Sequence, residues 1–158
     1  MVAVLTVAMG RPAMGVDTEY SRATLKGIEG MQVLVEDFTE GEKNAGFDSR
    51  IFQTDVELKL RLAGIKVLTS AERLTTPGTP YLYLNVNPLD SKTRNPPFSY
   101  SIGLEFYQVV LLARDPDISA HATTWSVGSI GNGALPYIRD WVKDHMDQFI
   151  NAWLSVNR

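Results

Sequence analysis

The sequence of 158 residues contains no cysteine, which excludes disulfide bonds, thiolate zinc sites and cysteine nucleophiles together. Its two histidines, His121 and His145, stand far apart and match no zinc-binding spacing, so the sequence indicates no metal and no other cofactor. The net charge of −3 provides no basic surplus for binding phosphates, which disfavours nucleic-acid binding. Internal repeats, low-complexity tracts and long blocks of one charge are also missing.

Long apolar runs are scarce as well. The run Val2–Met9 is far shorter than the roughly 20 apolar residues that a membrane span requires. We therefore expect no transmembrane segment.

The first 15 residues instead resemble part of a secretory signal. The apolar run is followed by Ala13-Met14-Gly15, which places small residues where signal peptidase accepts them. A positively charged segment before the run is missing, which suggests that the true start lies upstream. We expect residues 1–15 to be a truncated signal peptide, residues 16–158 to be a single domain, and the protein to be periplasmic or secreted. The alternative is a buried strand, because Val-Ala-Val-Leu-Thr-Val has good β propensity.

The hydrophobic pattern predicts four strands and two main helices. The strands are expected over residues 31–36, 81–87, 98–113 and 118–127, and the helices over residues 47–63 and from Leu135 to Trp153. Residues 39–46 and 69–80 are expected to be loops, and residues 115–117 a turn. A short helix over Ser21–Lys26 and a further strand directly after Gly64 complete the pattern.

The first main helix carries the clearest boundary signals. Asp48 is a suitable N-cap, with a capping box from Thr54 to Glu57 as the alternative if the helix starts later. Gly64 suits a left-handed position after the helix, with Ile65 placed to contact Leu60 as in a Schellman motif. We expect a wide apolar face on this helix, formed by the residues Phe47, Ile51, Phe52, Val56, Leu58, Leu60 and Leu62.

This order of elements predicts an α+β fold of two layers. The sheet is expected to be mixed, with about five strands, and to end in an antiparallel meander on its C-terminal side. The two main helices would cover one of its faces, and a right-handed crossover would make two strands parallel. Residues 107–112 are apolar at every second position on both sides, so this strand end is covered on both faces or contains a bulge near Gln108.

The strongest candidate for binding is the polar side of the strand over residues 81–87. Tyr81, Tyr83, Asn85 and Asn87 alternate with Leu82, Leu84 and Val86. With Ser99, Ser101 and Glu105 of the next strand they would form a flat aromatic and amide surface, of a kind enriched at interfaces. The alternative is an ordinary solvated sheet face.

A second candidate is the segment Gly128-Ser-Ile-Gly131-Asn132-Gly133, expected as a loop before the last helix. It could hold an anion at the helix N-terminus, where free N–H groups favour negative charge. It lacks the spacing of a dinucleotide motif and the lysine of a P-loop. The alternative is a tight turn with positive φ angles and Asn132 as N-cap.

Catalytic signals are weak. Glu105 and His121 are the only pair that could serve as acid and base, and a structural histidine is the alternative reading of His121. His145 is expected to be a packing residue at the edge of the apolar stripe of the last helix. The acidic residues Glu36, Asp37, Glu40 and Glu42 are expected to form a solvated loop, since their spacing matches no calcium-binding EF-hand.

Four segments of the chain resemble a family of small exported bacterial proteins without assigned activity. They are Thr54–Ile65, Tyr81–Asn87, Thr124–Gly128 and Phe149–Asn157. The resemblance spans about residues 28–157, implies export, and transfers no catalytic residue. The element order is also loosely similar to the N-terminal domain of the Tol-system periplasmic propeller protein and to outer-membrane lipoprotein activators of cell-wall synthases, which are interaction modules.

The sequence therefore predicts a non-catalytic protein-interaction or envelope-assembly module, with an enzyme less favoured. It would bind another envelope protein, or a second copy of itself, through the sheet face. The alternatives are a carboxylate-dependent hydrolase and a carrier of a small anion.

Overall fold

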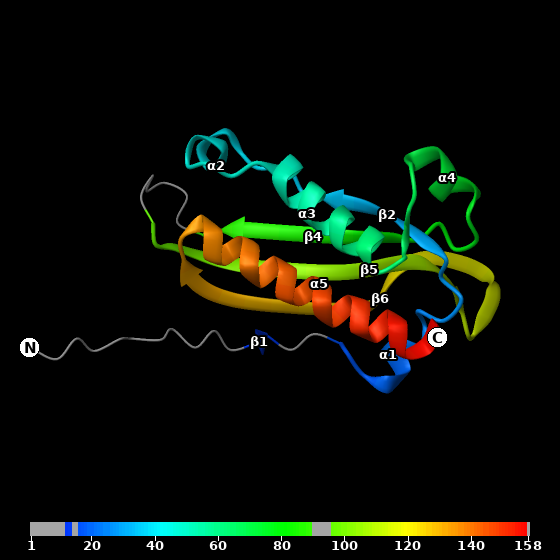
Figure 1. Ribbon diagram of the computed structural model, residues 1–158. Coiled ribbons are helices and arrows are strands. Elements are labelled where there is room, and N and C mark those ends of the chain that lie inside the picture. The colour runs from blue at the N-terminus through cyan, green and yellow to red at the C-terminus, as the bar shows by residue number, and fades with distance from the viewer. Residues whose placement is uncertain (1–11, 14–15, 90–95, 158) are drawn as a thin grey trace, which may run out of the picture.

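The computed structural model describes residues 12–13, 16–89 and 96–157. Its elements, drawn in Figure 1, are β1 (Pro12–Ala13), α1 (Glu19–Ala23), β2 (Gly30–Val35), α2 (Glu40–Asn44), α3 (Ser49–Leu62), β3 (Lys66–Val67), α4 (Ser70–Thr75), β4 (Tyr81–Pro88), β5 (Phe98–Leu112), β6 (Asp115–Gly133) and α5 (Leu135–Asn157).

The strands form one mixed sheet in the order β1-β6-β5-β4-β2-β3. Strands β4, β5 and β6 pair antiparallel as a meander, while β2 runs parallel to β4 and β3. Helices α3 and α5 lie side by side across one face of this sheet (Figure 1). The predicted α+β fold, with a mixed sheet and helices packed on it, is confirmed.

The core lies between the sheet and these two helices. Trp125 of β6 is fully buried and meets Phe149 of α5 edge to face, with ring centroids 5.1 Å apart. Phe106 of β5 lies 5.9 Å from the same ring. Because these residues come from three elements, their contacts fix α5 across the meander.

The boundaries of α3 follow its sequence signals. The Asp48 carboxylate accepts a hydrogen bond from the Arg50 N–H at 2.9 Å, so the helix begins there and not at the later alternative. Gly64 has a φ of 79°, and the Ile65 N–H donates to the Leu60 carbonyl at 2.9 Å. The predicted Schellman motif is confirmed.

The expected width of the apolar face of α3 is wrong. Phe52, Val56 and Leu60 are buried, but Ile51 and Leu58 are 40% and 52% exposed, and Leu62 is 78% exposed. Helix α5 lies beside α3 rather than over it, so only one narrow stripe of α3 meets the sheet.

Two segments expected as loops each contain a short helix. Helix α2 starts at a capping box between Thr39 and Glu42, and α4 starts at one between Thr69 and Glu72. Both show the spacing of Ser or Thr followed three residues later by Glu. Their glycine and proline content concealed that signal.

The last strand is longer than predicted. No separate turn occurs at residues 115–117, because the two-residue loop Ala113-Arg114 already joins β5 to β6. A bulge does occur close to Gln108, but on β6: Phe106 pairs with Trp125 and Tyr107 with Thr123, which leaves Thr124 extra. The end of β5 is not covered on both faces, since Leu111 is 63% exposed.

The N-terminal segment is described only at Pro12 and Ala13, which pair antiparallel with Ser129 and Gly128 of β6. The rest of the predicted signal peptide, and the alternative strand over Val2–Val7, lie outside the described residues. Within the described part of the chain, no helix has the length and apolar character needed to cross a membrane.

One buried polar contact joins α5 to β6. The Ser129 hydroxyl lies 3.0 Å from His145 Nε2, and both side chains are buried. His145 Nδ1 has no hydrogen-bond partner among the described residues. The prediction of His145 as a packing residue is confirmed, with this polar contact in addition.

We expect this histidine to make stability depend on pH. Burial lowers the pKa of His145 from its ordinary 6.5. The unfolded chain therefore binds a proton at His145 near pH 6.5, whereas the folded chain binds it only at a lower pH. As a result, protonation of His145 does not reduce the free energy of unfolding above pH 6.5, but reduces it as the pH falls below that value. Thermal melts should show a falling Tm from pH 7.5 to pH 5.5, and a shallower fall in His145→Gln. Equal slopes would contradict the assignment.

Candidate functional site

The sheet face opposite α3 and α5 carries the predicted tyrosine row. Leu82, Leu84 and Val86 are buried beneath the helices. The alternating residues Tyr81, Tyr83, Asn85 and Asn87 therefore point to the other side, where the first three are half-buried and the last is exposed. We call this side the helix-free face, because neither of the two main helices, α3 and α5, lies on it.

The tyrosines are packed against one another across two strands. Tyr81 of β4 and Tyr107 of β5 are paired in the ladder, and their rings stack in parallel at 4.9 Å. Tyr83 meets Tyr107 edge to face at 6.2 Å. The Arg73 guanidinium lies 5.5 Å from the centre of the Tyr81 ring, and the His121 ring lies 6.1 Å from it. The result is one aromatic cluster of fixed geometry.

Two carboxylates hold the tyrosine hydroxyls. The Tyr83 hydroxyl donates to Glu36 Oε2 at 2.5 Å, and the Asn85 amide donates to the same oxygen. The Tyr107 hydroxyl donates to Glu105 Oε2 at 2.6 Å. Burial, together with the Glu36 carboxylate, raises the pKa of Tyr83 to about 12, and the hydrogen bond to Glu105 raises that of Tyr107. Both phenols therefore remain hydrogen-bond donors at physiological pH.

This arrangement can bind a partner at low entropic cost. Rings that are already stacked and hydrogen-bonded lose little rotamer freedom on contact. Sequence reasoning found Tyr81, Tyr83 and Glu105 but missed Glu36, Arg73 and Tyr107 as parts of one surface. The parallel register of β2 and β4, which brings Glu36 to Tyr83 and Asn85, was the missing information.

The candidate catalytic pair is not assembled. Glu105 is opposite Ser126, whereas His121 is opposite Val109, four residues farther along β5. Four residues of a strand span about 13 Å. Glu105 also accepts a hydrogen bond from Thr123 at 3.1 Å, and His121 lies 2.7 Å from the Thr79 hydroxyl. The two side chains therefore have separate partners.

The expected anion-binding loop is a strand. Gly128, Gly131, Asn132 and Gly133 all belong to β6, and none of these glycines has a positive φ. Asn132 is not an N-cap, because its side chain accepts a hydrogen bond from Ser99 at 2.7 Å across the ladder. The absence of a side chain at these glycines instead lets groups of β5 pack closely against β6. A Cβ at Gly128 would lie 2.9 Å from the Ile102 carbonyl oxygen, and one at Gly131 would lie 2.9 Å from the Tyr100 hydroxyl.

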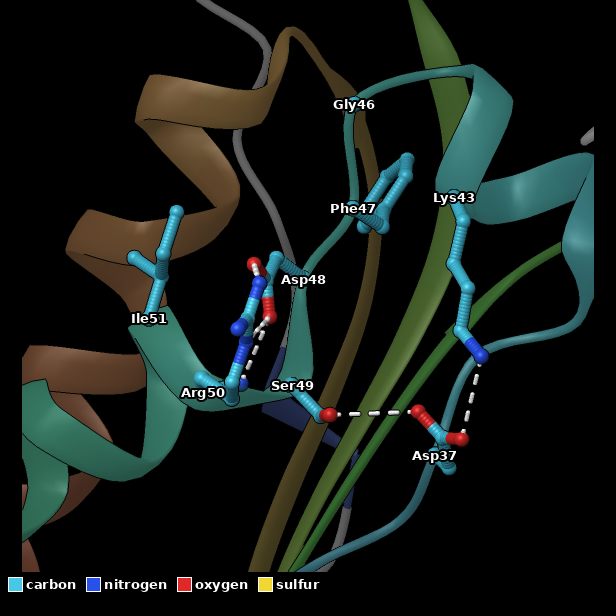
Figure 2. A pocket seen from close by; sticks show the side chains of 8 residues that line it. All are labelled: Asp37, Lys43, Gly46, Phe47, Asp48, Ser49, Arg50 and Ile51. Atoms are coloured by element: carbon cyan, nitrogen blue, oxygen red, sulfur yellow. Dashed lines mark hydrogen bonds and ion pairs between the residues drawn. The ribbon is translucent and has the colours of Figure 1, made fainter.

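A groove of about 710 Å³ lies at the start of α3 and is shown in Figure 2. Lys43 pairs with Asp37 at 3.1 Å, and Arg50 pairs with Asp48 at 2.8 Å. The Ser49 hydroxyl also donates to Asp37. Since each cation in the groove is matched by a carboxylate of the chain, the groove offers no net charge to a ligand.

The acidic residues at the end of β2 separate in space. Glu36 joins the helix-free face, Asp37 and Glu40 pair with Lys43, and Glu42 caps α2. In the described ranges, no three His, Asp or Glu side chains come together as metal ligands.

No protein-family model, curated protein or solved structure matches the chain. The resemblance to small exported bacterial proteins therefore stays a prediction.

We expect Gly128→Ala to destabilise the fold, because the new methyl group would press on the backbone of β5. The loss should be about 1–3 kcal/mol, the usual cost of overpacking. Gly103→Ala is the matched control: Gly103 pairs with Gly128, but a Cβ there meets only the Glu105 carboxylate at 3.8 Å. Urea unfolding measures both. Equal effects of the two substitutions would contradict the close-packing explanation.

Proposed function

We propose that this protein is a non-catalytic interaction module of the bacterial envelope that binds a protein partner through the helix-free face. The observation that carries the proposal is the network of stacked tyrosines and two carboxylates on that face. Helices α3 and α5 pack on the opposite side of the sheet (Figure 1), and the short helix α4 reaches this side through Arg73, which lies over the Tyr81 ring.

The composition of the face suits recognition of protein. Tyrosine offers a large, stiff and amphipathic contact area, and aromatic residues are enriched at interfaces. Asn87 is exposed at one end of the row, and the half-buried Ser99 and Ser101 continue the surface on β5. These groups can exchange hydrogen bonds with a partner around the aromatic cluster.

The alternatives have less support. A carboxylate-dependent hydrolase would need Glu105 and His121 to act on one substrate, yet they are offset by four residues along β5, about 13 Å. An anion carrier would need backbone N–H groups free in a glycine loop, and residues 128–133 pair with β5 instead.

The envelope location is supported by the sequence of the first 15 residues. The apolar run and the Ala13-Met14-Gly15 ending are features of a signal peptide. Cleavage after Gly15 would remove β1, which contributes only two residues to the sheet.

We expect a photoreactive amino acid at Asn87 to cross-link a protein of defined mass in cells that produce the full chain. The same amino acid at Gln148, which is exposed on α5, should not capture it. Adding Tyr83→Ala to the Asn87 variant should weaken capture roughly 30-fold, the effect of losing about 2 kcal/mol at an interface hot spot. Mass spectrometry identifies the captured protein, and a melting curve checks that each variant is folded.

Two outcomes would contradict this docking face. One is the same set of adducts from Asn87 and Gln148. The other is capture from Asn87 that is insensitive to Tyr83→Ala in a folded protein.

We also expect the protein to be exported and cleaved. N-terminal sequencing of the protein from the periplasmic or secreted fraction should read Val-Asp-Thr-Glu, beginning at Val16. Protein found only in the cytoplasm with its N-terminal residues retained would contradict the envelope location, while leaving the docking face untouched.

A further inference from the structure

The two edges of the sheet differ strongly. At one edge, β3 is two residues long and carries Lys66, which pairs with Glu72 at 2.8 Å. At the other edge, β6 is 19 residues long, and within residues 12–13, 16–89 and 96–157 only β1 pairs with its outer side. Short length and charge are standard protections of an edge against further pairing, and β3 has both.

The stretch Ser119–Thr123 of β6, here called the open edge, lacks these protections. Its sequence Ser-Ala-His-Ala-Thr contains no lysine, arginine, carboxylate, proline or glycine. It pairs regularly with Leu111–Tyr107 of β5, between one register shift at each end. Four of its residues are exposed, and Ala122 is half-buried. The open edge is therefore a regular row of five residues without a fixed charge, bounded by an irregularity at each end.

We propose that the open edge pairs antiparallel with the open edge of a second copy of this chain, about a two-fold axis at His121. A strand that pairs antiparallel with its own copy is self-complementary, as a two-fold interface requires. Ser119 would then lie opposite Thr123 of the partner subunit. The two sheets would join into one, with their helix-free faces on the same side.

The second copy is favoured over another partner by the chemistry of this row. The open edge has no fixed charge with which to select a different protein. Its alanines at 120 and 122 leave room for close approach of the strands. Beside it, Ile118 is 45% exposed and Leu111 is 63% exposed, so the hairpin end offers apolar surface that a second hairpin can cover.

The size of the contact predicts a weak dimer. Five residues of a strand span about 17 Å, so the buried area falls at the low end of specific interfaces. We expect dissociation constants of the order of 10–100 μM, typical of a transient assembly. This proposal does not depend on the docking function of the helix-free face.

The test uses charge at the axis. Sedimentation equilibrium of the full chain between about 5 and 500 μM should show a monomer–dimer equilibrium. His121→Lys and His121→Asp should each weaken it about tenfold or more, because two like charges would lie directly opposite in the ladder. An equimolar mixture of the two variants should dimerise again, since opposite charges would then meet. Gln148→Lys and Gln148→Asp introduce the same charges at an exposed position on α5. They should leave dimerisation unchanged.

Three outcomes would overturn the proposal. The first is a strictly monomeric protein across this range of concentration. The second is a dimer that neither substitution at His121 weakens. The third is a pair of monomeric, folded variants whose mixture stays monomeric, because a two-fold axis at His121 requires the rescue.

Discussion

The whole molecule depends on burial against one face of the sheet. Helices α3 and α5 both pack on the same side, where Leu82, Phe106 and Trp125 are removed from water. This burial provides most of the driving force for folding. It also means that the opposite side must be stable while exposed, and the chain achieves this by hydrogen bonds between tyrosines and carboxylates rather than by a second helical layer.

The features that could be predicted from sequence are those set by neighbouring residues. The N-cap at Asp48 and the reversal at Gly64 follow from local hydrogen bonding and backbone freedom. The alternation along β4 likewise places its tyrosines on one face, because successive side chains point to opposite sides. The α+β class follows from the order of such elements. The small helices α2 and α4 were also within reach, since both capping boxes are visible in the sequence.

The errors concern partners that are distant in the sequence. The outer residues of α3 belong to an apolar pattern, and only the position of α5 decides that Leu58 and Leu62 are exposed. The glycines of residues 128–133 suggest a turn, but they are required by the Ile102 backbone and the Tyr100 side chain. Glu36 meets Tyr83 only through the parallel pairing of β2 with β4. In each case the cause is a tertiary contact that local spacing does not contain.

The short connection between β5 and β6 affects the order in which the strands of the sheet fold. Its loop has two residues, so the meander can form by local contacts, in the microsecond range of hairpins. The parallel pairing of β2 with β4 must instead close a long crossover, which is slow. During synthesis, the apolar stripe of α3 therefore emerges well before β5 and β6 exist to cover it. The first half of the chain lacks Phe106, Trp125 and Phe149, which complete the core, so we expect it to fold only when the second half has been synthesised.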